Sequence, residues 1–203
     1  MSDNFIQFTG NWKKALKDID YMYKNFGRII EVIINRELLK YVGMVKKGIK
    51  DQAPGGKRFR PLSAWTLALR KFRRFRGTKA LIVSGDMRNA MTHVYSKSRQ
   101  EGFAGILYKT KSKDGQQMTN IAEIHEFGTK PFAVKRTPKM RKFLAMVASK
   151  SGLISYSPNY RGKGVYIIKI PARPFLGPTF EAWKKGLGDR IVVDFKQALL
   201  KGK

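Results

Sequence analysis

The feature that most constrains the fold is an apolar stripe near the N-terminus. Between residues 28 and 52, apolar side chains recur every three or four residues, as on one face of an α-helix. The stripe consists of Ile30, Ile34, Leu38, Tyr41, Val45 and Ile49. A second apolar line follows Ile29, Val32, Ile33 and Leu39. Because this helix is apolar on more than one side, we expect it to lie in the core and also to contact a neighbouring subunit.

Periodicity and turn residues predict the remaining elements. Helices are expected at residues 11–26, 28–52, 62–74, 86–91, 117–127, 138–150 and 174–200. Extended segments are expected at residues 92–95, 102–110 and 165–170. Gly27 is a candidate break or kink between the first two helices, Ser63 is a candidate cap, and the glycines at 186 and 188 weaken the last helix.

This inventory predicts an α+β fold, with a small antiparallel β-sheet packed against a long N-terminal helix and a C-terminal helix. The 203 residues are enough for one domain with a core of its own, so we expect a single domain over 1–203 with an N-terminal helical region at 1–56. The sequence has no cysteine, which excludes disulfides and cysteine-based zinc sites. No apolar run is long enough to span a bilayer, so no membrane partner is expected.

The chain is strongly basic, with 42 Lys and Arg against 14 Asp and Glu and a formal net charge of +28. No acidic residue occurs between Asp51 and Asp86 or between Glu126 and Glu181. Such an excess implies a polyanionic or acidic neighbour, either nucleic acid or an acidic protein surface, although a merely soluble basic surface is the alternative. The candidate contacts are Lys71, Arg73, Arg74, Arg76, Lys139, Arg141 and Lys142.

Residues 71–76 interleave cations with aromatic rings. One interpretation is a nucleic-acid groove, in which arginine binds phosphate and phenylalanine stacks on bases. The other is a solvated helix end whose aromatic rings enter the core. We favour the second for Phe72 and Phe75 and leave the role of the arginines open.

Catalytic and metal-binding patterns are not apparent. The only histidines are His93 and His125, and the His125-Glu126 pair lacks the second histidine of a zinc-protease helix. A metal-dependent nuclease needs clustered carboxylates, which are scarce here. We therefore expect no enzyme activity and no cofactor, and a core or interface role for His125.

We interpret two short motifs as architectural, that is, as segments that set the course of the backbone. The first is Ile-His-Glu-Phe-Gly-Thr at 124–129, in which Gly128 is expected to close a helix in the left-handed conformation. The second is Ile-Pro-Ala-Arg-Pro-Phe-Leu-Gly-Pro at 170–178, whose prolines are expected to end a strand and start a helix. At this corner we expect a buried Phe175 and Leu176, and an Arg173 that is hydrogen-bonded or points to a neighbour. The motif residues are His125, Phe127, Gly128, Pro171, Arg173, Pro174, Phe175 and Leu176.

Two further blocks precede these motifs: Pro-Leu-Ser-Ala-Trp-Thr at 61–66, and an apolar run ending in Ser-Gly-Asp-Met at 84–87 after a basic stretch. The four blocks, in this order, resemble the virion morphogenesis, or tail-completion, proteins of tailed bacteriophages. That family carries Pro-Leu-Ser-x-x-Thr, Ser/Thr-Gly-x-Leu, His-x-Phe-Gly and Pro-Ala-Arg-x-Phe-Leu segments, and Met87 replaces the usual leucine. The resemblance implies a tail-completion-like α+β core at 57–203. The long first helical region and an insert near 130–165 depart from the compact family pattern.

The resemblance implies a structural virion protein that forms a ring at the head-proximal end of the tail or in the neck, as a tail terminator or in head–tail joining. Its expected partners are further copies of itself, most simply in a hexamer, together with tail tube or sheath proteins and neck or head-connector proteins. Genomic DNA in the lumen would be contacted without sequence specificity. The protein would be assembled in the host cytoplasm and located in the virion. The alternative, a non-enzymatic basic nucleic-acid-binding protein, explains the charge but not the ordered motifs.

Overall fold

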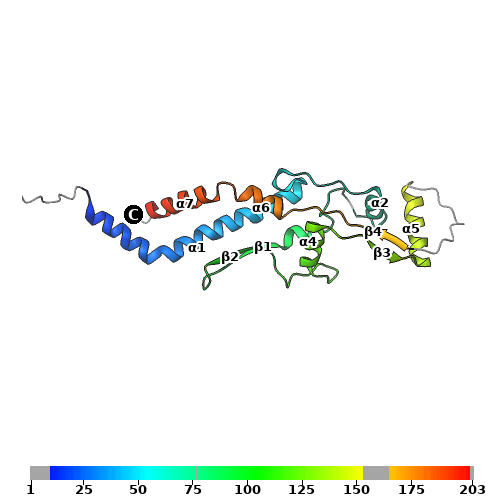
Figure 1. Ribbon diagram of the computed structural model, residues 1–203, viewed down its shortest axis with the longest axis horizontal. Helices are drawn as coiled ribbons and strands as arrows, with labels where there is room; N and C mark the ends of the chain where they lie inside the picture. The colour runs from blue at the N-terminus through cyan, green and yellow to red at the C-terminus, as the bar shows by residue number, and fades with distance from the viewer. Residues whose placement is uncertain (1–9, 76, 153–164, 202–203) are drawn as a thin grey trace, which may run out of the picture.

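Helices and two short antiparallel sheets form an elongated molecule (Figure 1). The computed structural model describes residues 10–75, 77–152 and 165–201, and the structural statements below concern these residues. The helices are α1 (Trp12–Asp51), α2 (Ala64–Phe72), α3 (Asp86–Ala90), α4 (Met118–Phe127), α5 (Pro138–Ser151), α6 (Gly177–Trp183) and α7 (Leu187–Lys201), with a 3₁₀ turn η1 (Pro54–Gly56). The strands are β1 (Met91–Ser96), β2 (Glu101–Ile106), β3 (Phe132–Lys135) and β4 (Val165–Ile168). The predicted α+β class is confirmed.

The two helices predicted at 11–26 and 28–52 are one helix of 40 residues, α1. The side chain of Asn11 caps its start by accepting from the amide of Lys14, and Gln52 ends it in the left-handed conformation. Gly27 does not break the helix, because a single glycine costs only about 1 kcal/mol in a helix interior. The helix nevertheless changes direction in its N-terminal part (Figure 1).

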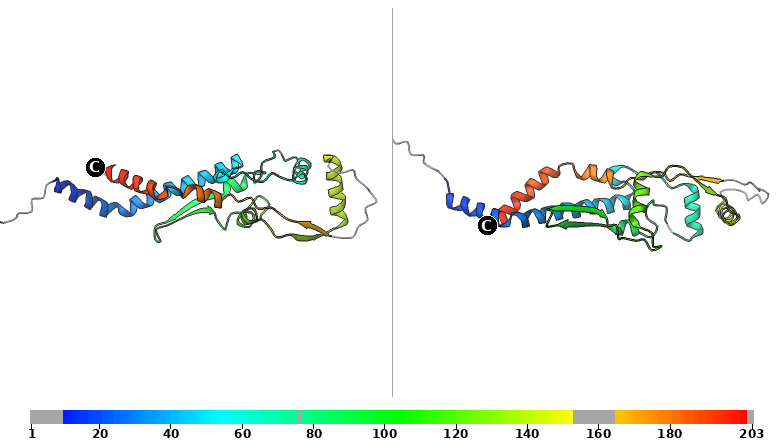
Figure 2. Two further views of the ribbon diagram at one scale, coloured as in Figure 1. Left: turned by 45° about the horizontal axis from the view of Figure 1, so that its top comes forward. Right: turned by 60° about the horizontal axis from the view of Figure 1, so that its bottom comes forward.

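Helix α1 is the central element against which the β1–β2 hairpin, α6 and α7 pack. The β1–β2 hairpin lies on one side of it and α7 on another (Figure 2). The hairpin comes close because Gly102 has no side chain: a Cβ there would lie 2.6 Å from Cδ1 of Leu38. α7 is held by an Arg36–Asp194 ion pair of 2.9 Å and by the edge-to-face rings of Phe26 and Phe195.

The main core lies where the C-terminal half of α1 meets α3, α4 and the chain before α6. Its most buried members are Val45 and Ile49 of α1, Met91 of β1 and Phe175, each at most 1% exposed. The predicted stripe therefore enters the core over its second half. The second apolar line is divided: Ile29 and Ile33 are buried within the monomer, whereas Val32 and Leu39 are 50% and 59% exposed.

The β-structure differs from the prediction of one small sheet. β1 pairs only with β2, and β3 only with β4, so the strands form two separate two-stranded sheets. Strand β3 was missed because Phe132–Lys135 contains a single β-branched residue, whereas the equally short β4, which was predicted, contains three. At the end of the molecule that carries β3 and β4 (Figure 1), α2 packs on α5, and the rings of Phe72 and Phe143 meet edge to face with their centres 5.5 Å apart.

The prediction of a single C-terminal helix at 174–200 is wrong. The chain forms α6 and α7, separated at Gly186, whose φ of +66° is readily adopted only by glycine. Pro174 precedes the helix, and Pro178 occupies its first turn instead. No helix in the described part of the chain is both long and apolar enough to cross a membrane.

Candidate functional site

The two architectural motifs meet through the carboxylate of Glu126, near the end of α4. Its Oε2 accepts hydrogen bonds from the backbone amides of Phe175 at 2.8 Å and Leu176 at 3.0 Å, and its Oε1 accepts one from Gly177 at 2.8 Å. These amides belong to the start of α6, which has no side-chain cap of its own because Leu176 occupies the cap position. Glu126 thus supplies the missing cap from a distant part of the sequence. Its negative charge also interacts favourably with the positive N-terminal end of the α6 dipole.

Backbone contacts hold the same two segments together. The amide of Arg173 donates to the carbonyl of His125 at 2.7 Å, and the amide of Thr129 donates to the carbonyl of Ile170 at 3.0 Å. The amide of Ile170 in turn donates to Oγ1 of Thr129 at 3.0 Å. We call this junction the motif clasp, formed by His125, Glu126, Gly128, Thr129, Ile170, Arg173, Phe175, Leu176 and Gly177.

Gly128 ends α4, as predicted, but not in the left-handed conformation. Its φ is +74° and its ψ is −171°, a combination that is essentially confined to glycine. A Cβ at this position would also lie 2.8 Å from the amide nitrogen of Ala172 and 2.8 Å from the carbonyl oxygen of Ile170. Glycine is therefore required both by the backbone angle and by the close approach of the second motif.

Phe175 is fully buried, as predicted, whereas Leu176, which was also predicted to be buried, is only half-buried. The hydroxyl of Tyr41 donates to the carbonyl of Leu176 at 3.2 Å, which attaches the corner to α1. Burial, with a smaller contribution from the nearby negative charge of Glu126, raises the pKa of Tyr41 to about 12. The hydroxyl of Thr179, in the first turn of α6, donates to the carbonyl of Phe175 at 2.7 Å.

Arg173 is buried and hydrogen-bonded within its own chain. Its Nε donates to the carbonyl of Arg60 at 3.0 Å, and its Nη2 donates to the carbonyl of Pro61 at 3.1 Å. It thus joins the clasp to the start of the 61–66 block. Burial lowers the pKa of His125, and the positive charge of Arg173 lowers it further.

The remaining motif residues face outward. Phe127 is 77% exposed beside the clasp, Pro174 is exposed and Pro171 is half-exposed. Phe127 directly follows Glu126, so its exposed ring lies on backbone that the clasp holds in place.

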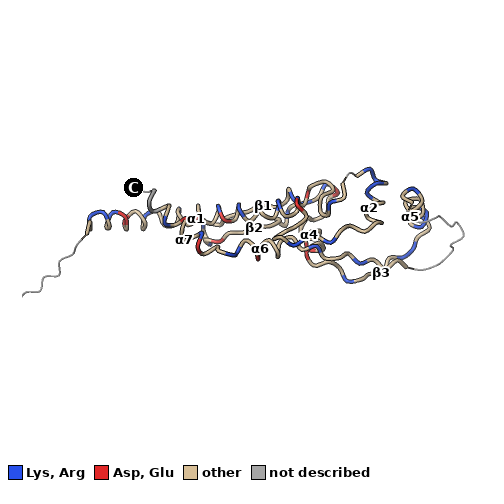
Figure 3. The backbone as a smooth tube through the Cα atoms, turned by 90° about the horizontal axis from the view of Figure 1, so that it is seen from above, with Lys and Arg blue, Asp and Glu red and all other residues tan. Residues whose placement is uncertain are grey.

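The predicted basic contacts gather at one end of the molecule. The α2–α5 packing brings Lys71, Arg73 and Arg74 near the helix that carries the other three described candidates, and Figure 3 shows lysine and arginine along both elements. Those three are Lys139, Arg141 and Lys142 on α5. None of these six forms an ion pair within the described chain, and Arg76 lies outside the described residues.

The two aromatic residues of the basic segment behave differently. Phe72 packs on Phe143, with Nζ of Lys150 5.6 Å from the centre of its ring. Phe75 is 46% exposed, so the expectation that it enters the core is wrong. It lies beyond the end of α2, where Arg74 has a positive φ of +58° and turns the chain away from the helix.

Sequence reasoning missed a buried network that joins three helices. Glu37 of α1 is 5% exposed and accepts from Arg190 of α7, with the shortest contact 2.8 Å from Nη2, and from Nε1 of Trp183 of α6 at 3.1 Å. The hydrogen bond from Arg190 is the main reason that the pKa of Glu37 is lowered. The available signal was an acidic residue directly before Leu38 in the apolar stripe, because a buried carboxylate requires a partner.

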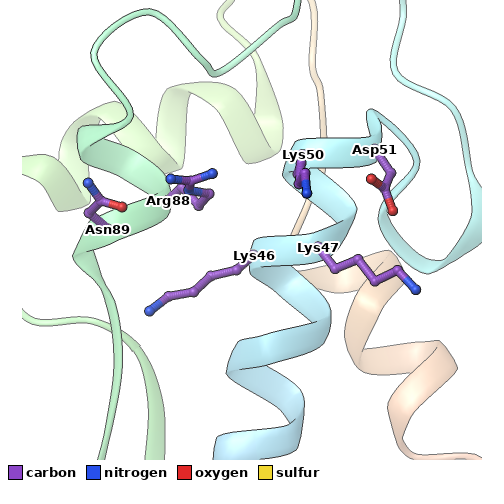
Figure 4. Close-up of a pocket in the computed structure, with 6 residues that line it drawn as sticks. All are labelled: Lys46, Lys47, Lys50, Asp51, Arg88 and Asn89. Carbon is purple, nitrogen blue, oxygen red and sulfur yellow. The ribbon is translucent and has the colours of Figure 1, made fainter.

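The described residues offer little for chemistry. No group of three or more His, Cys, Asp or Glu side chains is placed to hold a metal ion among them. A hollow of about 470 Å³ at the C-terminal end of α1 is lined by Lys46, Lys47, Lys50 and Asp51 of α1 and by Arg88 and Asn89 of α3. Figure 4 shows Lys46 extending toward Arg88 and Asn89, with Lys47 and Asp51 on the opposite side of α1. This lining is basic and contains no nucleophile paired with a base.

Comparison with known proteins identifies one family. A family model described as the phage virion morphogenesis family matches residues 34–185. The matched region contains the clasp and both basic elements, whereas the whole first half of α1 and all of α7 lie outside it. Neither the search of curated proteins nor that of solved structures gives a significant match.

Proposed function

The chain belongs to the phage virion morphogenesis family, and on that premise we propose that it is a structural ring subunit at the head-proximal end of a phage tail or in the neck. Its role there is geometric: it ends the tail or joins tail to head, with no reaction to catalyse. Copies of the chain contact one another head to tail, and such a contact closes into a ring, here with six subunits.

The motif clasp is the observation that carries this proposal. Glu126, Gly128 and Arg173 act on backbone groups of the same chain, and together they fix a rigid corner. That corner holds the exposed Phe127 at the surface. A rigid corner beside an exposed apolar ring suits a subunit whose task is to present a fixed surface to its neighbours.

The basic end formed by α2 and α5 is the second surface of the subunit. In a ring it faces either DNA in the lumen or an acidic surface of a tail, neck or connector protein. Contacts with DNA would be independent of sequence, because lysine and arginine bind phosphate without reading bases.

The decisive experiment combines light scattering and electron microscopy of the purified chain, alone and with tail tubes. Rings, or capped tube ends, are expected. Phe127→Ser should weaken ring formation without unfolding the monomer, whereas Phe103→Ser, at another exposed phenylalanine, should not. A chain that remains monomeric at high concentration and in the presence of tubes would refute the proposal.

Phage lacking the protein would distinguish the two positions. Loss of a terminator gives tails of irregular length, whereas loss of a neck protein gives finished tails and filled heads that fail to join. Joined, infectious particles in its absence would contradict both.

The six described candidate cations, Lys71, Arg73, Arg74, Lys139, Arg141 and Lys142, form no ion pair with the described residues, and they also support a second candidate function, non-enzymatic nucleic-acid binding. Gel shifts with unrelated duplexes at low and moderate salt test it. The logarithm of the affinity should fall by about 0.9 per tenfold increase in salt for each phosphate neutralised. Absence of binding at low salt would leave acidic protein as the partner of the basic end.

A further inference from the structure

The first part of α1 carries an apolar stripe that is largely exposed. Within the described residues, Leu16, Ile19 and Tyr23 are 64%, 61% and 87% exposed, and Trp12 at the start of the stripe is 51% exposed. The stripe continues into Phe26, where α7 begins to cover α1 through Phe195. The exposed stripe therefore extends an established helix–helix interface, and it lies at one extremity of the elongated molecule (Figure 1).

The spacing of the stripe selects a helical occupant. Steps of four, three, four and three residues from Trp12 to Phe26 are a heptad repeat, with Leu16 and Tyr23 at the a positions and Trp12, Ile19 and Phe26 at the d positions. Such a seam is covered by another helix packed along it at a small crossing angle. We call residues 12–26 of α1 the arm.

The flanking residues select a second copy of the same arm. Lys13 and Asp20 occupy the two e positions, and Ala15 and Met22 occupy the two g positions. In an antiparallel pair, e positions face e positions and g positions face g positions. Placing Leu16 against Ile19 of the second copy sets Trp12 against Tyr23, Lys13 against Asp20, and Ala15 against Met22. One register thus satisfies both the apolar seam and the charges.

The parallel arrangement lacks this agreement. There, g positions face e positions, so Ala15 would lie against Asp20 and Met22 against Gly27, without an ion pair. Asp20 is accessible for the antiparallel contact, because its side chain is 61% exposed and its only described partner, Lys24, lies one turn along the same helix. We infer that two copies of this chain pair through their arms as an antiparallel, two-fold symmetric helix pair.

This contact is independent of the proposed ring. It is isologous, whereas ring closure uses a head-to-tail contact, and the arm precedes the region matched by the family. The arm pair thus makes a dimer of free chains or joins two rings face to face. Either way, breaking it halves the mass of the assembled species.

Sedimentation or light scattering of the full chain over a range of concentrations tests the pairing. Leu16→Glu should halve the mass, or raise the dissociation constant at least tenfold, with an unchanged circular dichroism spectrum. Ile167→Glu is the matched control, since Ile167 is 75% exposed on β4, and it should leave the pairing intact. Equal masses for Leu16→Glu and the unmodified chain would overturn the inference.

Cross-linking tests the orientation, since the chain has no cysteine of its own. A mixture of Leu16→Cys and Ile19→Cys should form a mixed disulfide dimer, while each variant alone should cross-link poorly. Efficient cross-linking of each variant with itself would indicate parallel arms and overturn the antiparallel assignment.

A charge exchange tests the register. Lys13→Glu should weaken pairing, because the substituted carboxylate would lie against Asp20 of the second copy, and the double variant Lys13→Glu/Asp20→Lys should restore it. Failure of the double variant to recover would contradict the register.

Discussion

Replacement of Glu126 measures what the motif clasp contributes to stability. Its carboxylate accepts three backbone hydrogen bonds at 2.8–3.0 Å. Glutamine is nearly isosteric, but its amide nitrogen cannot accept a hydrogen bond, so at least one amide at the start of α6 would face another donor. Hydrogen bonds to charged groups contribute about 1.5–3 kcal/mol each.

We therefore expect Glu126→Gln to lower the free energy of unfolding by about 2 kcal/mol and Glu126→Ala by about 3 kcal/mol, since Glu126 is only half-buried and water replaces part of what is lost. The assay is equilibrium denaturation followed by circular dichroism. Hydrogen exchange should accelerate most at the amides of Phe175, Leu176 and Gly177. This local effect distinguishes the lost cap from general destabilisation.

Glu123→Gln is the matched control. Glu123 lies one turn earlier on α4, is exposed and forms no ion pair within the described residues, so its substitution should change stability by less than about 0.5 kcal/mol. If Glu126→Gln is as mild as this control, the carboxylate does not cap α6 and the account of the clasp is wrong.

Three further substitutions test the core and the buried charges. Phe175→Ala should cost about 3–5 kcal/mol in denaturant titrations, because a fully buried ring is removed; a cost below about 1 kcal/mol would contradict the corner packing. Glu37→Gln should cost about 3 kcal/mol by thermal or chemical unfolding, because the buried Arg190 contact loses its charge partner; an unchanged midpoint would show that the network contributes nothing. The lowered pKa of His125 means that below about pH 6.5 the unfolded chain binds a proton that the folded chain does not. The free energy of unfolding should therefore fall as the pH drops below that value, and His125→Gln should remove this part of the pH dependence; identical pH profiles would refute it.

Local physical chemistry made much of the secondary structure predictable. The stripe from Leu38 to Ile49 predicted a helix entering the core, because helical periodicity depends only on neighbouring residues. Ser63 caps α2 as expected, by accepting from the amide of Thr66. The burial of Phe175 and the hydrogen bonding of Arg173 also followed from the motif itself.

Local sequence patterns did not predict where every helix ends. Helix α1 runs through Gly27, a candidate break, whereas the C-terminal helix is divided at Gly186, which was predicted only to weaken it. The first lies within a long helix whose other residues favour continuation, whereas at the second the chain takes a positive φ and Arg190 reaches back to the carbonyl of Trp183 at 2.9 Å. Contacts made after the turn thus decide where the helix ends.

By itself, the sequence determined which segments are helical, although not where every helix begins and ends, together with the basic character and the two architectural motifs. Each of these is a property of neighbouring residues or of composition. Only the tertiary structure decided that Glu126 caps α6, that Glu37 is neutralised by Arg190, and that the cations of α2 and α5 gather at one end. Each of these pairings joins residues far apart along the chain. A carboxylate in the sequence carries no mark of the amide or guanidinium that will satisfy it, because that partner is selected only when the elements pack.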